Sequence, residues 1–427
     1  MDASAIDNKG DDGSILLSAR RRTDGADSVR VLRPRRAAPA DAVRPTRAEV
    51  NLAALRHNLR VIARHAGHAK VWPVLKADGY GHGAPAVART LERAGAEGFC
   101  VALLEEAVEL RDAGVRAPIL VMGGYYGGAY DEIVARGVVP VVYDPTHLEG
   151  LARASRDANH PVDAHLKIDT GMARLGVRMR DLESFAAQCA RFPEVRITGL
   201  MTHLACAEVD SGTDASGFTA EQVARFEEAT RRLASAAISP VVRHAANSAA
   251  VLRGEALFDA VRPGVSIFGV SPIAARVPAP REGERGPTEL RPVMRVRSEI
   301  VDLRTIAAGE SVGYGALFRA TRATRVATLP MGYADGLSRH LSNRGQVLVR
   351  GARAPIIGAI SMDMSMIDVT DIPGVGLRDE VTVLGAQEGP LGRDVLTADG
   401  IAKEAGSIAW EVLTAVSRRV PRFYREP

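Results

Sequence analysis

A short apolar run, a turn and an amphipathic helical segment follow one another eight times between residues 71 and 268, and this repeat is the strongest constraint on the fold. Runs of this length that alternate with helices indicate βαβ units, whose strands lie parallel. Eight such units in succession close most economically into a (β/α)8 barrel. The eight runs are Val71–Leu75, Gly98–Leu104, Pro118–Met122, Val138–Tyr143, Val162–Ile168, Ile197–His203, Val241–Ala245 and Val261–Phe268.

The rhythm changes on both sides of this repeat. After residue 270, strand-like runs follow one another with few helices between them, beyond a Gly-, Pro- and charge-rich loop at 278–287. We therefore expect an α/β TIM barrel over 45–270 and a mostly β domain over 271–427. Residues 1–44 have few large apolar side chains and no sustained period, so we expect a disordered tail. The first strand, at 45–53, is expected to pack with the C-terminal domain.

Composition excludes several classes of protein. The net charge is +4 and basic residues are spread along the chain, so nucleic acid is not an expected partner. The three cysteines form no CxxC pair, which argues against a disulfide framework and against a zinc site. No stretch approaches the roughly 20 apolar residues that span a bilayer. We expect a cytoplasmic protein with no bound metal and no membrane contact.

Lys76 ends the first apolar run and precedes a glycine-rich turn at 77–83. The carboxyl ends of the strands are where a barrel of this type keeps its chemistry. The chain uses only five lysines among 55 basic residues, so each lysine calls for an explanation. A desolvated lysine can attack an aldehyde, as in pyridoxal phosphate enzymes, whereas arginine stays protonated and cannot. The alternative is a strand-end lysine that extends to water.

Three further polar residues mark the ends of strands or tight turns. Arg174 lies in a turn after the fifth run, where it could clamp a small carboxylate or simply be a surface arginine. His203 ends the sixth run, and a lone histidine there is also compatible with a core position. Tyr314 is flanked by Gly313 and Gly315; it could act as a base or pack at an interface.

The segments after the seventh and eighth runs suit an anion. Ser248 begins a helical stretch, and Gly264 with the Val265 amide follows the eighth run, which is where barrels usually bind phosphate. Arg262 lies beside them. A guanidinium only donates hydrogen bonds, so an arginine facing a pyridine nitrogen keeps that nitrogen unprotonated. This arrangement favours reversible removal of one α-proton over decarboxylation or transamination.

Taken together, these residues resemble one family, the alanine racemases. The resemblance covers the chain from about residue 44 to its C-terminus, and its most specific parts are the lysine motif followed by the arginine-proline-glycine motif. The matching segments are residues 44–46, 74–83, 165–176, 244–248, 262–264, 312–315, 332–336 and 361–364.

The resemblance implies an isomerase that interconverts L-alanine and D-alanine by a two-base mechanism with pyridoxal 5'-phosphate, supplying D-alanine for peptidoglycan. It implies a homodimer whose active sites combine Lys76 of one subunit with Tyr314 of the other. Lys76 matches the lysine that bonds to the cofactor and is the base for D-alanine; Tyr314 matches the base for L-alanine.

Further site residues are carried over position by position. Arg174 and the backbone amide of Met362 match groups that hold the substrate carboxylate. Lys167 matches a lysine that is often carbamylated in this family, a negative modification that would orient Arg174. His203 matches a link between Arg262 and Tyr314. The cofactor-binding residues implied by the resemblance are Lys76, Tyr80, His203, Asn247, Ser248, Arg262, Gly264, Val265 and Trp410.

One departure bears on substrate range. Trp410 stands where the family usually has a tyrosine that contacts the phosphate and narrows the pocket. We expect the bulkier ring to crowd the site and alanine to remain preferred over serine; the alternative is a broad-specificity or serine racemase. A barrel decarboxylase would place an acidic residue at Arg262 and a cysteine at Ser361. A non-enzymatic pyridoxal-phosphate carrier would be a lone barrel without the residues after Gly269.

Overall fold

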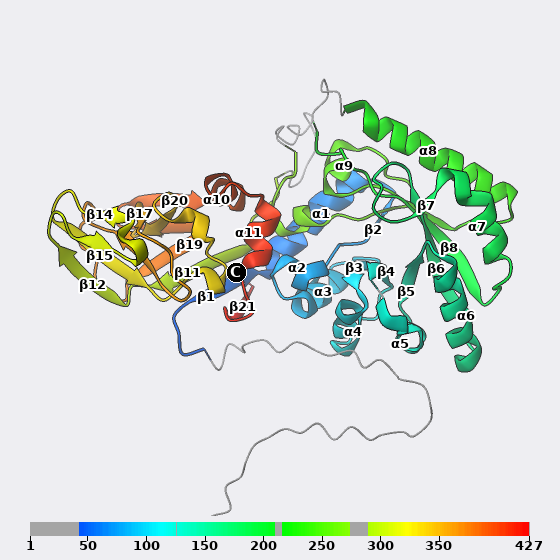
Figure 1. The fold of residues 1–427 in the computed structure, drawn as a ribbon, viewed down its shortest axis with the longest axis horizontal. Helices are drawn as coiled ribbons and strands as arrows, with labels where there is room; N and C mark the ends of the chain where they lie inside the picture. Colours follow the sequence, from blue (N-terminus) through cyan, green and yellow to red (C-terminus); the bar gives the residue numbers. More distant parts are fainter. Residues whose placement is uncertain (1–41, 125, 210–215, 274–288, 427) are drawn as a thin grey trace, which may run out of the picture.

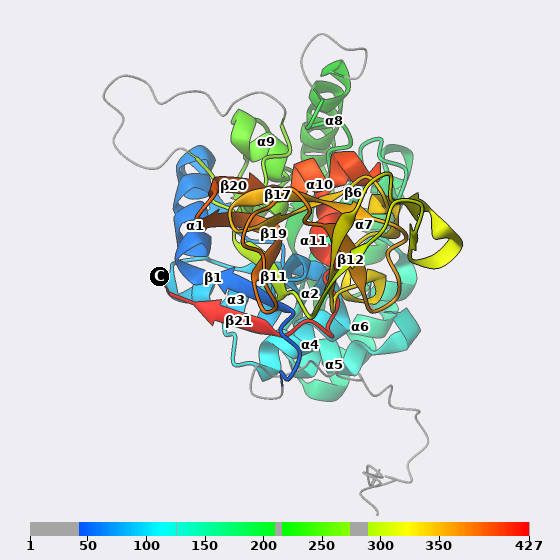
Figure 2. The ribbon, with the colours of Figure 1, turned by 90° about the vertical axis from the view of Figure 1, so that its left-hand side faces the viewer.

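The computed structural model describes residues 42–124, 126–209, 216–273 and 289–426. The expected tail at 1–44 lies almost wholly outside these residues, and the expected loop at 278–287 lies entirely outside them. Figure 1 shows a helix-covered barrel beside a β-rich domain, with helices α10 (Ala398–Ala405) and α11 (Ala409–Ala415) where the two meet. Figure 2 looks onto the β-rich domain, with the barrel helices behind it.

The barrel strands lie parallel, as expected from the repeat. Within the described residues their order is β2-β10-β9-β8-β6-β5-β4-β3, and a bridge from Val74 to Cys100 joins the first strand to β3. The α/β barrel predicted from the sequence is therefore confirmed. The strands are β2 (Lys70–Val71), β3 (Phe99–Leu103), β4 (Ile119–Gly124), β5 (Val139–Val142), β6 (Val162–Asp169), β8 (Val195–Met201), β9 (Val242–His244) and β10 (Ala260–Val261).

Local sequence signals set the ends of the surrounding helices. In α6, the Asp144 carboxylate accepts a hydrogen bond from the Thr146 amide, Pro145 occupies the first turn, and Asn159 ends the helix in a left-handed conformation. The barrel helices are α1 (Leu52–Ala66), α2 (Lys76–Tyr80), α3 (Ala84–Arg93), α4 (Leu104–Asp112), α5 (Tyr130–Ala135), α6 (Pro145–Ala158), α7 (Leu182–Cys189), α8 (Ser216–Ser235) and α9 (Ser248–Arg253).

The eighth run differs from the single strand expected over Val261–Phe268. It consists of the short strand β10 and a 3-10 helix, η4 (Val265–Phe268). Pro263 has no N–H to donate to a neighbouring strand, and Gly264 adopts φ −109° and ψ −93°, outside the extended region. The chain therefore turns at 262–264, which places Gly264 at the end of the barrel strands.

The C-terminal domain is mostly β, as expected. Its main sheet has the order β12-β15-β18-β17-β16-β19-β11-β1-β21, with β20 on β19. Strand β1 precedes the barrel in sequence, yet it pairs antiparallel with β11 and parallel with β21. The strands are β1 (Arg47–Asn51), β11 (Met294–Glu299), β12 (Asp302–Ile306), β15 (Thr324–Leu329), β16 (Gln346–Val349), β17 (Ala352–Ile357), β18 (Ser365–Asp368), β19 (Glu380–Gly389), β20 (Gly392–Leu396) and β21 (Arg422–Arg425); β13 (Ser311–Val312) and β14 (Phe318–Arg319) form a separate hairpin.

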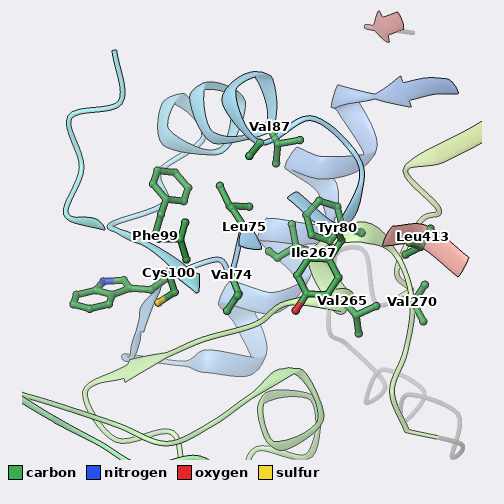
Figure 3. Packing of buried hydrophobic residues seen from close by; sticks show 14 of the residues in the cluster. Val74, Leu75, Tyr80, Val87, Phe99, Cys100, Val265, Ile267, Val270 and Leu413 are labelled. Carbon is green, nitrogen blue, oxygen red and sulfur yellow. The ribbon is translucent and has the colours of Figure 1, made fainter. Parts of the chain in front are cut away.

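An apolar cluster lies directly beneath the turn that carries Lys76. Leu75, Phe99 and Ile267 are fully buried; Figure 3 shows Ile267 beside the Tyr80 ring, while Phe99 lies on the far side of Leu75, next to Cys100. Burying a side chain of this size contributes about 1.5–3 kcal/mol to the stability of the fold. The turn therefore packs against a stable apolar cluster. No helix in the described residues has the length and hydropathy needed to cross a membrane.

Candidate active site

The turn after Lys76 has an unusual backbone. Ala77, Asp78, Gly79 and Tyr80 all have φ between 51° and 60°. The left-handed region costs an L-residue about 1–2 kcal/mol, so a run of such residues persists only where other contacts enforce it. The Gly79 amide donates to the Leu75 carbonyl at 2.9 Å, and the Asp78 carboxylate accepts from the Ala84 amide at 2.8 Å. These contacts fix Lys76 and Tyr80 at the two ends of one rigid turn.

Glu106 anchors this turn from the neighbouring helix α4. One carboxylate oxygen accepts from the Ala77 amide at 2.6 Å, and the other accepts from the Ala102 and Leu103 amides at 2.8 and 3.1 Å. Our sequence reasoning missed this residue. The available signal was a glutamate at the third position of a helix, which commonly accepts from free amides at a helix start.

We expect Glu106→Ala to lower the free energy of unfolding by about 1–3 kcal/mol, because it removes the acceptor shared by three amides and water replaces only part of it. Urea denaturation of the purified variant measures the change. Glu105→Ala is the matched control, since Glu105 is exposed on the same helix. Equal midpoints for the two variants would show that Glu106 does not hold the turn.

Cationic side chains converge at the barrel mouth. Lys167, on β6, is 5% exposed, and its pKa is lowered to about 8, first by burial and then by the charges of Arg174 and Arg262. Burial and the charge of Arg174 also lower the pKa of Lys76, while Glu106 acts in the opposite direction. Lys167, Arg174 and His203 line one small cavity. These cations repel one another, and an anion bound among them would offset that repulsion and be stabilised by their charges.

Arg262 is 3% exposed and held by several acceptors. One terminal nitrogen lies 2.5 Å from Nδ1 of His244, and the other donates to the carbonyls of Thr202 at 2.7 Å and Ala245 at 3.1 Å. The resemblance implies that His203 links Arg262 to Tyr314. The charge of Arg262 does lower the pKa of His203, but the histidine that hydrogen-bonds Arg262 in the described residues is His244.

The tautomers of two buried histidines follow from this contact. Arginine only donates, so Nδ1 of His244 must accept and its proton lies on Nε2. That Nε2 lies 2.7 Å from Nδ1 of His165, which must therefore accept in turn. Burial lowers the pKa of His165 to about 3 and that of His244 well below its usual value. Two neutral histidines thus form a hydrogen-bonded chain with Arg262: His244 contacts Arg262, and His165 contacts His244.

These buried histidines predict a loss of stability in acid. His82, His165 and His244 stay neutral in the folded chain, and burial lowers the pKa of His82 to about 3. The unfolded chain takes up protons at these residues below about pH 6.5, whereas the folded chain does not. The free energy of unfolding therefore decreases as the pH is lowered, by about 1.4 kcal/mol per pH unit for each histidine. Urea denaturation at pH 7, 6 and 5 should show this slope.

A single histidine can be tested against a surface control. His82→Asn should reduce the acid slope by the share of one histidine, whereas His160→Asn, at an exposed position, should leave it unchanged. An unchanged slope in His82→Asn would contradict a neutral His82 in the folded chain.

An anion cradle lies between η4, α9 and the Lys76 turn. Asn247 caps α9 by accepting from two amides of its first turn, both at 3.1 Å, and the Gly264 amide donates to the Ser248 hydroxyl at 2.8 Å. A Cβ on Gly264 would collide with the Tyr80 hydroxyl, so that hydroxyl lies directly over the glycine backbone. Burial raises the pKa of Tyr80, which keeps it a donor. Hydroxyl and amide donors at a helix start suit a phosphate, so the residues fit the phosphate group of pyridoxal phosphate.

Helix α11 closes one side of the Lys76 turn. The Leu413 carbonyl lies so close to Gly81 that a Cβ there would collide with it. Arg422 donates two hydrogen bonds to the Gly81 carbonyl, at 2.9 and 2.8 Å. Trp410 lies on α11 and is half-buried against the core. The same helix therefore supports the turn and carries Trp410, which departs from the expected motif.

The remaining expected residues lie elsewhere in the chain. Tyr314 is 74% exposed and Met362 is 52% exposed, both in the C-terminal domain. Tyr314 follows Gly313, whose φ of 71° favours glycine, in the hairpin that ends at β14. Figure 1 shows β14 near the outer end of the domain, well separated from α2. Within one subunit, Tyr314 and Lys76 do not share a site.

Comparison with known proteins identifies relatives along almost the whole chain. The family model described as alanine racemase, N-terminal domain, matches residues 50–272, and that described as alanine racemase, C-terminal domain, matches residues 293–424. An alanine racemase of Sorangium cellulosum is 60% identical over 393 residues, which cover 90% of this chain and 100% of the relative.

Solved structures show the same similarity. Alanine racemase from Streptomyces coelicolor has a TM-score of 0.81 and 35% identity, covering 90% of this chain and 99% of its own. An alanine racemase from Bartonella henselae with covalently bound pyridoxal phosphate has a TM-score of 0.76 and 29% identity, covering 89% of this chain and 99% of its own.

Proposed function

The chain belongs to the alanine racemase family, and from this premise we propose how its own residues interconvert L-alanine and D-alanine. The protein is an isomerase of a pyridoxal-phosphate-dependent family. The observation that carries the residue assignment is Lys76 on its left-handed turn, with Tyr80 at the far end of the same turn over the anion cradle. A covalent anchor and a phosphate site are thereby held at a fixed separation.

The residues that hold the cofactor follow from the donor sets. Lys76 supplies the amine that bonds to the aldehyde, with a pKa lowered by burial and Arg174. Tyr80, Ser248, Gly264 and Val265 receive the phosphate beside α9, whose start is capped by Asn247. Arg262 is held by His244 and two carbonyls and would donate to the pyridine nitrogen. When bound, pyridoxal phosphate delocalises the electrons left after removal of the α-proton.

Racemisation needs a proton donor and acceptor on each face of the α-carbon. Lys76 takes or gives the proton on the face used by D-alanine, and Tyr314 of the partner does so on the face used by L-alanine. We assign His203 as the link between Arg262 and the partner's tyrosine; its pKa is lowered to about 3 by burial and by nearby cations, the first of which is Arg262. Its neutral ring can pass a proton on without a change of charge only by taking a proton at one nitrogen and releasing one from the other.

Two groups hold the substrate carboxylate. Arg174 lies among the cations at the barrel mouth and clamps the carboxylate from this subunit. The Met362 amide approaches from the partner. Lys167, with a pKa near 8, has a neutral fraction at neutral pH that can attack carbon dioxide, forming an N–C bond and losing a proton. The resulting carbamate carries a negative charge that orients Arg174 and reduces the repulsion among the cations.

Two copies of the chain complete each site. Tyr314 and Met362 are exposed, and so are the nearby apolar side chains Leu317, Tyr333 and Met364. Such a group of exposed apolar residues marks an interaction surface. A head-to-tail homodimer buries it against the barrel mouth of the partner and brings Tyr314 to the partner's Lys76.

Incubation with L-alanine in deuterium oxide tests the proposed function. We expect α-deuterated D-alanine from the wild-type protein, and an absence of exchange would refute the proposal. Serine is measured alongside, because Trp410 is expected to crowd the site; equal kcat/KM for serine and alanine would mark a broad-specificity racemase.

A further inference from the structure

A second cavity lies between the two domains, behind the proposed active site. Its volume is about 540 Å³, within the range of roughly 300–1,000 Å³ that is usual for small-molecule sites. Its lining comes from the barrel side, through Phe268 and Val270, and from the C-terminal domain, through strands β11, β19 and β20 and the start of α10. Boundaries between domains are preferred places for ligand sites.

The lining is mainly apolar. Phe268, Val270, Met294 and Leu384 are among the lining residues and are buried, whereas Val395 on β20 is 41% exposed. Contact with water over this surface is unfavourable, so an apolar body that displaces the water gains free energy in proportion to the area it covers. The cavity therefore suits a ligand with an apolar part.

Two charged side chains of the lining, Arg393 and Asp399, make no ion pair within the described residues. Arg425 donates to Glu49 at 2.8 Å, and Arg295 pairs with Glu380. Arg393 lies on β20 and Asp399 in the first turn of α10, and both side chains are exposed. A carboxylate on the ligand would accept hydrogen bonds from the Arg393 guanidinium and form an ion pair with it.

One wall of this cavity is also the back of the cofactor cradle. The Phe268 ring stacks on His82 at 4.3 Å between centroids and lies 5.1 Å from the Tyr80 ring. Leu413 also lines the cavity, and its carbonyl lies close to Gly81. Figure 3 shows Val270 and Leu413 on the same side of Tyr80. A ligand that restrains Phe268 and Leu413 therefore restrains the turn that carries Lys76.

We propose that this cavity binds a small carboxylate with an apolar body, and that its occupancy changes the behaviour of the active site through Phe268 and Leu413. The binding half of this proposal is independent of the proposed function, since it is measured without substrate. The kinetic half depends on racemisation, so a failure of one is distinguishable from a failure of the other.

Isothermal titration calorimetry with 4-phenylbutyrate tests the binding, and 4-phenylbutanamide is the neutral match. We expect the carboxylate to bind and Arg393→Gln to weaken that binding by about tenfold, through loss of a charged hydrogen bond. Val395→Trp, which enlarges a side chain of the lining, should abolish it. Arg304→Gln, at another exposed arginine of the same sheet, should have no effect.

Racemisation is then measured with and without 4-phenylbutyrate. Typical couplings between sites change an affinity by roughly fivefold or more, so we expect a KM change of this size in wild type and none in Arg393→Gln. The proposal is overturned if 4-phenylbutyrate does not bind, if the amide binds equally well, if Arg393→Gln binds normally, or if binding leaves both kinetic constants unchanged.

Discussion

Lys76→Ala will reduce racemisation by at least about 10⁴-fold, because it removes both the covalent anchor of the cofactor and one of the two positioned bases. The variant should also lose the visible absorption of bound cofactor on dialysis. The fold should persist, since burial and Arg174 lower the pKa of Lys76 and its removal relieves repulsion among neighbouring cations. Absorption spectra, urea denaturation and kcat/KM measure these three effects.

Lys70→Ala is the matched control for this prediction. Lys70 lies on β2, only six positions before Lys76, and it is exposed. It should keep both the cofactor and the activity. A Lys76→Ala protein that retains the visible band and turns over alanine would remove Lys76 from the role assigned to it.

The sequence predicted those parts of the fold that depend on local pattern. The repeat of apolar runs and helices indicated the barrel, and the strand-like runs after residue 270 indicated the mostly β domain, which includes β15 and β16. The strand expected at 261–268 was too long. Periodicity could not show that Pro263 would interrupt the pairing and that residues 265–268 would coil into a 3-10 helix.

The site was predictable where residues end strands, and not where it depends on tertiary contacts. Lys76 and Arg262 were predicted as site residues because strand ends converge in a barrel, and their roles stay predictions. The pairing of Arg262 with His244 was missed, because both residues had to be placed on neighbouring strands before their distance could be known. The left-handed turn was missed for a similar reason. Ala77 does not favour that conformation, which is imposed by Glu106 and the surrounding packing.

Tyr314→Phe will slow proton exchange from L-alanine by roughly 10²- to 10⁴-fold, the usual cost of losing a positioned base, and will slow exchange from D-alanine far less. The ring is retained, so packing at the interface changes little. Single-turnover exchange in deuterium oxide measures each face separately. Tyr424→Phe, at an exposed tyrosine on β21, should leave both rates unchanged. Equal losses on both faces would indicate a structural role for Tyr314.

Mixing two inactive variants tests whether Tyr314 acts on the partner. In a dimer with shared sites, a Lys76→Ala subunit paired with a Tyr314→Phe subunit has one site with both substitutions and one site with both native residues. Random reassociation makes about half of the dimers mixed, so about a quarter of the wild-type activity should return. If each site used Lys76 and Tyr314 of the same chain, mixing would restore nothing. The separation of β14 from α2 within one subunit favours recovery, and activity that stays at the level of the separate variants after denaturation and joint refolding would exclude the shared site.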